Sequence, residues 1–172
     1  MTTTGIHVDS FYDERLVMKI TDYLKAQHVN ASVRGRNKND IIEDMLKLIS
    51  TSENILDFEK VRQAVFEREQ IMSTGVGNGF AIPHGKSDAV KDIVAGFGIT
   101  ERPIEYDALD DKPVRLVFIL IGKENMVGSH IKLLSRVSRL MNNESFRAKL
   151  LSLKSSEAII EAFREEESLQ FV

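Results

Sequence analysis

Residues 114–121 have the sequence VRLVFILI, in which Arg115 is the only polar side chain. An apolar run of this length, rich in β-branched residues, predicts a strand that is buried on both faces. A second run, IVAGFGI at residues 93–99, precedes it and has the same character. Together the two runs indicate a central β-sheet.

Helical patterns occur on the N-terminal side of these strands. Asn39 or Asp40 can cap a helix whose apolar residues recur at helical spacing. These apolar residues are Ile41, Ile42, Met45, Leu46 and Ile49. A second helix is predicted from about residue 57 to residue 72, with Arg68 in its last turn. Its inward-facing residues are expected to be Phe58, Val61, Val65 and Ile71.

Further helices follow the strands. Gly128 and Ser129 begin a helix with apolar residues on one face that continues to Met141, and shorter helices are predicted near residues 144–152 and 155–163. Helices placed around a sheet predict an α/β or an α+β fold. The 172 residues contain no Pro/Gly/Ser-rich linker, so we expect a single domain.

Composition excludes several classes of protein. Hydrophobic residues make up 42% of the chain and charged residues 28%, as in an ordinary folded domain. There is no cysteine, which rules out disulfides and thiolate metal sites. The net charge of -3 and the scattered basic residues argue against nucleic acid as a partner. The longest apolar run is far shorter than the roughly 20 residues that cross a bilayer, so we expect no direct membrane insertion and a cytoplasmic protein.

Both ends of the chain differ from the middle. Residues 1–10 are polar and lack a pattern, which predicts a flexible N-terminal tail. Residues 164–172, REEESLQFV, predict an acidic C-terminal tail.

The segment most suited to chemistry is STGVGNGFAIPHG at residues 73–85. Its glycines and short apolar run predict a tight turn, a strand and then a loop, with His84 at the end of the sheet. Pro83 restricts the backbone before His84, and Gly85 after it tolerates angles that larger residues resist. An imidazole with an ordinary pKa near 6.5 is largely neutral at cellular pH, and its free ring nitrogen is a nucleophile toward phosphorus. A lone histidine in a turn is also often only a surface residue.

Two other side chains are candidates for the same site. His130 is predicted in the first turn of its helix, where ring N–H groups and the positive helix end can meet an anion. The alternative is that His130 merely edges the core. The planar guanidinium of Arg68 suits two phosphoryl oxygens, but an arginine near a helix end is often only a solvated charge.

Three segments resemble the fructose/mannitol class of enzyme IIA of the phosphoenolpyruvate-dependent phosphotransferase system, which includes a nitrogen-regulatory branch. The first joins Arg68-Glu69 to STGVGNGFAIPHGK at residues 73–86, the second is PIEYDALD at 103–110 with Pro113-Val114, and the third is SHIKLL at 129–134. The likeness covers roughly residues 15–163, and we expect the enzyme IIA domain to span residues 11–163. Phe80 departs from the family, which more often has a smaller aliphatic residue there.

The resemblance implies an α/β fold, namely a mixed β-sheet flanked by α-helices on both faces. It also implies that His84 receives a phosphoryl group from the phosphocarrier protein HPr, that His130 and Arg68 help to bind it, and that no metal or other cofactor is needed. The phosphoryl group would pass to an enzyme IIB, or the phosphorylation state would itself regulate partner proteins. The sequences STGVGNG and YDALDDKPV favour the nitrogen-regulatory branch.

Two other functions remain open from the sequence. His84, His130 and a carboxylate such as Asp88 could form the metal site of a hydrolase. The chain could also be a non-catalytic interaction module that keeps the fold and signals by binding proteins.

Overall fold

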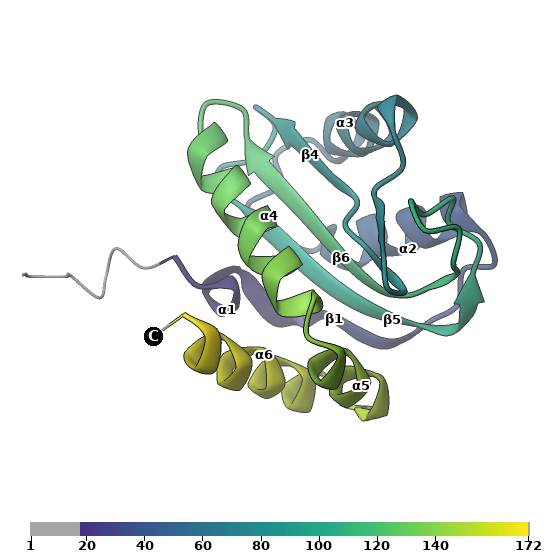
Figure 1. Cartoon of the computed structure of the whole chain (residues 1–172). Coiled ribbons are helices and arrows are strands. Elements are labelled where there is room, and N and C mark those ends of the chain that lie inside the picture. The colour runs from purple at the N-terminus through teal and green to yellow at the C-terminus, as the bar shows by residue number, and fades with distance from the viewer. Residues whose placement is uncertain (1–17, 172) are drawn as a thin grey trace, which may run out of the picture.

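The computed structural model describes residues 18–171, so the tail predicted at residues 1–10 lies outside it. Within these residues, a six-stranded mixed sheet lies between two layers of helices (Figure 1). The prediction of a mixed sheet covered by helices on both faces is therefore confirmed. The strands are β1 (Leu24–Val33), β2 (Gly75–Gly77), β3 (Phe80–Ala81), β4 (His84–Ser87), β5 (Val94–Ile104) and β6 (Val114–Lys123).

The apolar run at residues 114–121 forms β6, the strand around which the sheet is built. β5 pairs with β6 in antiparallel orientation, and β1 pairs with β5 in parallel orientation. β3 and β4 both lie parallel to the other side of β6, and β2 completes that edge by pairing with β3. Each face of β6 contacts a helical layer, which explains why nearly every residue of the strand is apolar.

Proline interrupts the strand that carries the predicted nucleophile. Ala81 of β3 is opposite Val117, and His84 of β4 is opposite Leu120, so the two short strands follow one line along β6. Pro83 lies between them and has no N–H to donate, although its carbonyl still accepts from the Leu120 N–H at 3.1 Å. His84, which was expected in a loop, therefore begins a strand.

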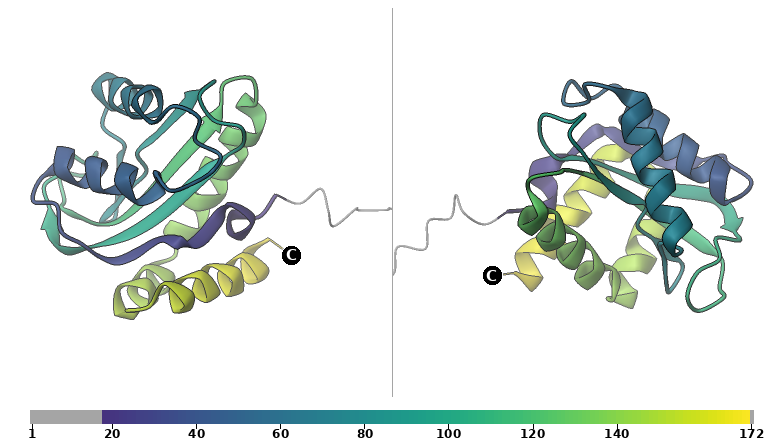
Figure 2. Two further views of the ribbon diagram at one scale, coloured as in Figure 1. Left: turned by 180° about the vertical axis from the view of Figure 1, so that it is seen from behind. Right: turned by 90° about the horizontal axis from the view of Figure 1, so that it is seen from above.

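The helices cover the two faces in sequence order (Figure 2). One face carries the two helices that precede the sheet's central strands, and the other carries the three that follow them. After the single-turn α1 (Ile20–Tyr23), the elements are α2 (Lys38–Ile49), α3 (Phe58–Ile71), α4 (Val127–Met141), α5 (Glu144–Ser152) and α6 (Ser156–Gln170). The cap of α2 is Asn37, whose side chain accepts from the Asp40 N–H, rather than the predicted Asn39 or Asp40.

Two apolar clusters hold these layers together, one on each face of the sheet. Phe80 belongs to the cluster on the α4–α6 face and is 1% exposed. The larger side chain at this position is thus accommodated within the core, where full burial of a phenylalanine contributes roughly 1.5–3 kcal/mol.

Two expectations about particular segments were wrong, and one strand was missed. The strand β1 was not predicted at all. Residues 164–170 continue α6 instead of forming a tail, because the Glu167 carboxylate is buried and accepts from the Ile20 N–H at 2.6 Å. On α3, Ile71 is 80% exposed, and the buried stripe of Val61 and Val65 continues to Glu69.

Candidate active site

His84 is held at the start of β4 by its own backbone neighbourhood. The ring Nδ1 lies 2.7 Å from the carbonyl oxygen of Ile82, so the tautomer that satisfies this carbonyl has a proton on Nδ1. Nε2 is then the nitrogen with a free lone pair. The side chain is partly buried, and Gly85 after it lies against α3, where an added Cβ would be 3.2 Å from the Val65 nitrogen. Gly85 is thus required for close packing, and not for the unusual backbone angles that were expected.

His130 lies beside His84. The two ring centroids are 5.6 Å apart and the ring planes are inclined by 46°. His130 is in the first turns of α4 and is 3% exposed. Its Nδ1 has no hydrogen-bond partner among residues 18–171 and faces Gly122 of β6, where a Cβ would lie only 2.3 Å away. The glycine therefore makes the space that His130 occupies.

Both imidazoles are neutral at cellular pH. Burial is the main cause of the lowered pKa of His84, and the positive charge of Arg68 lowers it further. The Ile82 carbonyl and the Glu69 carboxylate act in the opposite direction. Burial, and then the nearby His84 and Lys86, lower the pKa of His130 to about 4. The site therefore contains two uncharged rings, one of them with a free lone pair on Nε2.

Arg68 supplies a permanent positive charge close to this pair. It lies in the last turn of α3, and its Nη1 donates to the carbonyl oxygen of Met72 at 2.9 Å. This bond holds the guanidinium next to the turn that precedes the Gly-rich segment. Figure 1 shows β4 between α3 and α4, the two helices that carry Arg68 and His130.

A buried ion pair that lies behind the site was not predicted from the sequence. The Glu69 side chain is 5% exposed, and its Oε1 lies 2.7 Å from Lys38 Nζ of α2. The same oxygen accepts from the Thr74 N–H at 3.0 Å, and Oε2 accepts from the Thr74 hydroxyl. The hydroxyl of Tyr106 lies 3.2 Å from that of Thr74. The spacing of Val61, Val65 and Glu69 was the available signal, because a carboxylate in an apolar stripe needs a buried partner.

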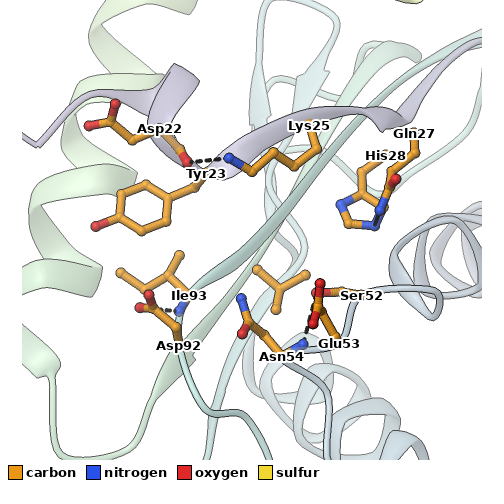
Figure 3. A pocket seen from close by; sticks show the side chains of 11 residues that line it. Asp22, Tyr23, Lys25, Gln27, His28, Ser52, Glu53, Asn54, Asp92 and Ile93 are labelled. Carbon is orange, nitrogen blue, oxygen red and sulfur yellow. Dashed lines mark hydrogen bonds between the residues drawn. The ribbon is translucent and has the colours of Figure 1, made fainter.

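The alternative of a metal site finds no support in the described part of the chain. Residues 18–171 contain no group of three histidine, cysteine or acidic side chains placed to hold a metal ion. A polar cavity of about 400 Å³ lies elsewhere, beside His28, Lys25 and Glu53 (Figure 3). Neither His84, His130 nor Arg68 lines this cavity. No helix within residues 18–171 is long and apolar enough to cross a membrane.

Comparison with known families matches residues 22–166 to the family described as phosphoenolpyruvate-dependent sugar phosphotransferase system, EIIA 2. The chain belongs to this family. It is thus a phosphotransferase enzyme IIA-type component, with a phosphocarrier or regulatory role.

Relatives of both branches are similar to this enzyme IIA-type chain. A nitrogen regulatory protein homolog of Haemophilus influenzae is 34% identical over 152 residues, covering 85% of this chain and 91% of the relative. A fructose-specific EIIABC component of Bacillus subtilis is 33% identical over 144 residues, which are 84% of this chain but only 23% of that longer protein.

Solved structures have the same fold. The nitrogen regulatory protein IIA-Ntr of Neisseria meningitidis matches with a TM-score of 0.79 at 33% identity, over 84% of this chain and 98% of that one. The mannitol enzyme IIA of Escherichia coli, in complex with its phosphorylated enzyme IIB, matches with a TM-score of 0.71 over 83% of this chain and 99% of that one. At 20% identity this second likeness concerns the fold alone.

Proposed function

We propose that Nε2 of His84 accepts a phosphoryl group from a phosphorylated HPr-type protein. The group then passes to an enzyme IIB, or its presence on His84 regulates partner proteins, as in the nitrogen-regulatory branch, which we favour. The observation that carries the proposal is the bond from His84 Nδ1 to the Ile82 carbonyl at 2.7 Å, beside the second imidazole. It leaves one free nucleophilic nitrogen on a ring of fixed orientation.

The transfer step follows from this tautomer. The lone pair of Nε2 attacks phosphorus while the N–P bond of the donor breaks, and the electron pair of that bond stays on the donor's ring. His84 keeps its proton on Nδ1, so its ring becomes positively charged as the new N–P bond forms. The hydrogen bond from Nδ1–H to the Ile82 carbonyl strengthens as this charge develops. No separate base is required, because the attacking nitrogen has no proton to lose.

His130 and Arg68 have distinct parts in the proposal. If neutral His130 had its proton on Nδ1, a buried N–H would lack a hydrogen-bond partner. We therefore place the proton on Nε2, where His130 can donate an N–H group to a phosphoryl oxygen. Arg68 offers the positive charge that a dianionic phosphoryl group needs. Both groups would stabilise the charge spread over the equatorial oxygens in a loose transition state.

Exposed apolar residues that are neighbours of His130 and Arg68 in the chain offer a docking surface for the protein donor. Val127 and Ile131 on α4 are 43% and 59% exposed, and they flank His130 in the sequence. Met72, whose carbonyl binds Arg68, is 56% exposed. Apolar side chains around a polar centre are the arrangement that a protein interface uses to exclude water.

The test is incubation with phosphoenolpyruvate, enzyme I and HPr, followed by intact mass measurement. Wild type, His84→Ala and His130→Ala are compared, with His28→Gln as a control histidine variant far from the pair. We expect one acid-labile phosphoryl group on wild type and on His28→Gln, none on His84→Ala, and slower incorporation on His130→Ala. If wild type stays unmodified while HPr is phosphorylated, and a related HPr also fails, the non-catalytic interaction module replaces the carrier.

A further inference from the structure

The orientation of His84 depends on a chain of hydrogen bonds that begins at Glu69. The Glu69 carboxylate accepts from the Thr74 N–H at 3.0 Å. The carbonyl of Thr74 accepts from the Ile82 N–H at 2.9 Å, and the carbonyl of Ile82 binds Nδ1 of His84 at 2.7 Å. Three bonds thus connect a buried carboxylate on α3 to the ring of His84.

Glu69 is itself held by partners on both of its carboxylate oxygens. Lys38 from α2 forms an ion pair with it at 2.7 Å, and the Lys38 side chain is 19% exposed. The Thr74 hydroxyl donates to the second carboxylate oxygen and is in turn 3.2 Å from the Tyr106 hydroxyl. Lys38 Nζ also lies 5.1 Å from the centre of the Tyr106 ring. The carboxylate therefore has partners on both oxygens, Lys38 of α2 and Thr74 before β2, and has little freedom to move.

The position of Thr74 connects Glu69 to the backbone next to His84. Thr74 directly precedes β2 and lies beside Ile82, the residue at the interruption between β3 and β4. The peptide N–H of Ile82 donates to the Thr74 carbonyl, next to the antiparallel pair of Gly75 and Ala81. If Thr74 moved, the peptide that sets the ring angle of His84 would move with it.

We infer that Glu69 is a positioning residue for His84, acting through Thr74 and Ile82 to fix the ring tautomer and angle for phosphoryl transfer. The inference rests on the proposed function, since it assigns the network to the same reaction. The negative charge of Glu69 adds a second effect, because it favours the positively charged ring that forms when His84 is phosphorylated. Glu69 contacts no reacting atom; it acts through these neighbours and through its charge.

The experiment compares Glu69→Gln with Glu67→Gln, an exposed glutamate on the same helix, so that both variants lose one negative charge. Nitrogen-15 NMR of the unphosphorylated protein reports the tautomer and the titration midpoint of His84, and quenched-flow mass analysis reports the rate of phosphoryl transfer. We expect Glu69→Gln to lower the His84 midpoint, weaken the Nδ1–H tautomer and slow transfer about tenfold or more. Glu67→Gln should leave all three unchanged.

A second pair of variants tests the inference even if Glu69→Gln does not fold. Thr74→Val keeps the shape but removes the hydroxyl that binds Glu69, whereas Thr74→Ser keeps the hydroxyl and should transfer at close to the wild-type rate. An unchanged tautomer, midpoint and rate in folded Glu69→Gln would overturn the inference, as would equal rates for Thr74→Val and Thr74→Ser. If wild type accepts no phosphoryl group, the proposed function fails, and the NMR measurements then decide the positioning role separately.

Discussion

Gly122→Ala tests whether the position of His130 controls phosphoryl transfer. The new Cβ would lie 2.3 Å from Nδ1 of His130, whereas ordinary contacts of a Cβ begin near 3.4 Å. The ring must therefore move by about 1 Å, together with the first turns of α4. A displacement of about 1 Å in a catalytic group costs on the order of 100-fold in rate. We expect the rate of transfer to fall by about 10- to 100-fold while His84 can still be phosphorylated to completion.

Gly128→Ala is the matched control for this substitution. Gly128 also lies in the first turn of α4, but a Cβ there meets nothing within 4 Å. Quenched-flow incubation with phosphorylated HPr gives the rates, NMR reports whether the His130 ring has moved, and thermal unfolding shows whether each variant is intact. The reasoning is refuted if Gly122→Ala displaces His130 and still transfers as fast as Gly128→Ala.

Three other predictions concern acid stability, docking and the C-terminal helix. Because the pKa of His130 is lowered to about 4, the unfolded chain binds its proton first, so stability is lost as pH falls from about 6.5 to about 4. Over this pH range, chemical denaturation should show that the unfolding free energy of the wild type falls by up to about 3 kcal/mol more than that of His130→Gln. Equal losses of unfolding free energy would contradict the lowered pKa of His130. Ile131→Asp should slow transfer at low donor concentration about tenfold without changing the melting temperature, whereas Leu169→Asp, on the exposed side of α6, should transfer normally; equal rates would argue against the docking surface. Glu167→Ala should reduce the unfolding free energy by about 2–4 kcal/mol by leaving buried donors unpaired, and a loss no larger than that of exposed Glu165→Ala would argue against this role.

The central strands could be predicted from the sequence, but β1 could not, for a reason visible in its pairing. Strands buried on both faces are apolar throughout, as in VRLVFILI, and need no knowledge of their neighbours. In β1, His28 and Val29 are both buried although they are consecutive, and the pairing with β5 shifts register on either side of Val29 and Asn30. The irregularity breaks the two-residue alternation on which strand prediction depends.

The site was partly predictable for a similar reason. His84 is marked by the local sequence Ile82-Pro83-His84-Gly85, and His130 by its place at the start of an amphipathic helix, so local features indicated both. Glu69 had weaker signals, namely its helical spacing from Val61 and Val65 and its place beside Arg68, and neither showed that the carboxylate is buried, because a glutamate on a helix is usually a solvated charge. Its burial depends on Lys38 from another helix, which only the folded chain brings within reach.

The protonation states of the two histidines decide where positive charge must come from in the proposed reaction. Burial keeps both imidazoles neutral, so His84 attacks without first losing a proton and His130 contributes a hydrogen bond instead of a full charge. The permanent charge of Arg68 is then needed against the phosphoryl oxygens. The same charge lowers the pKa of His84, and the nearby Glu69 opposes this effect. Adjacent residues of α3 thus act in opposite directions on one ring: Arg68 favours the neutral nucleophile before transfer, and Glu69 favours the charged ring that transfer produces.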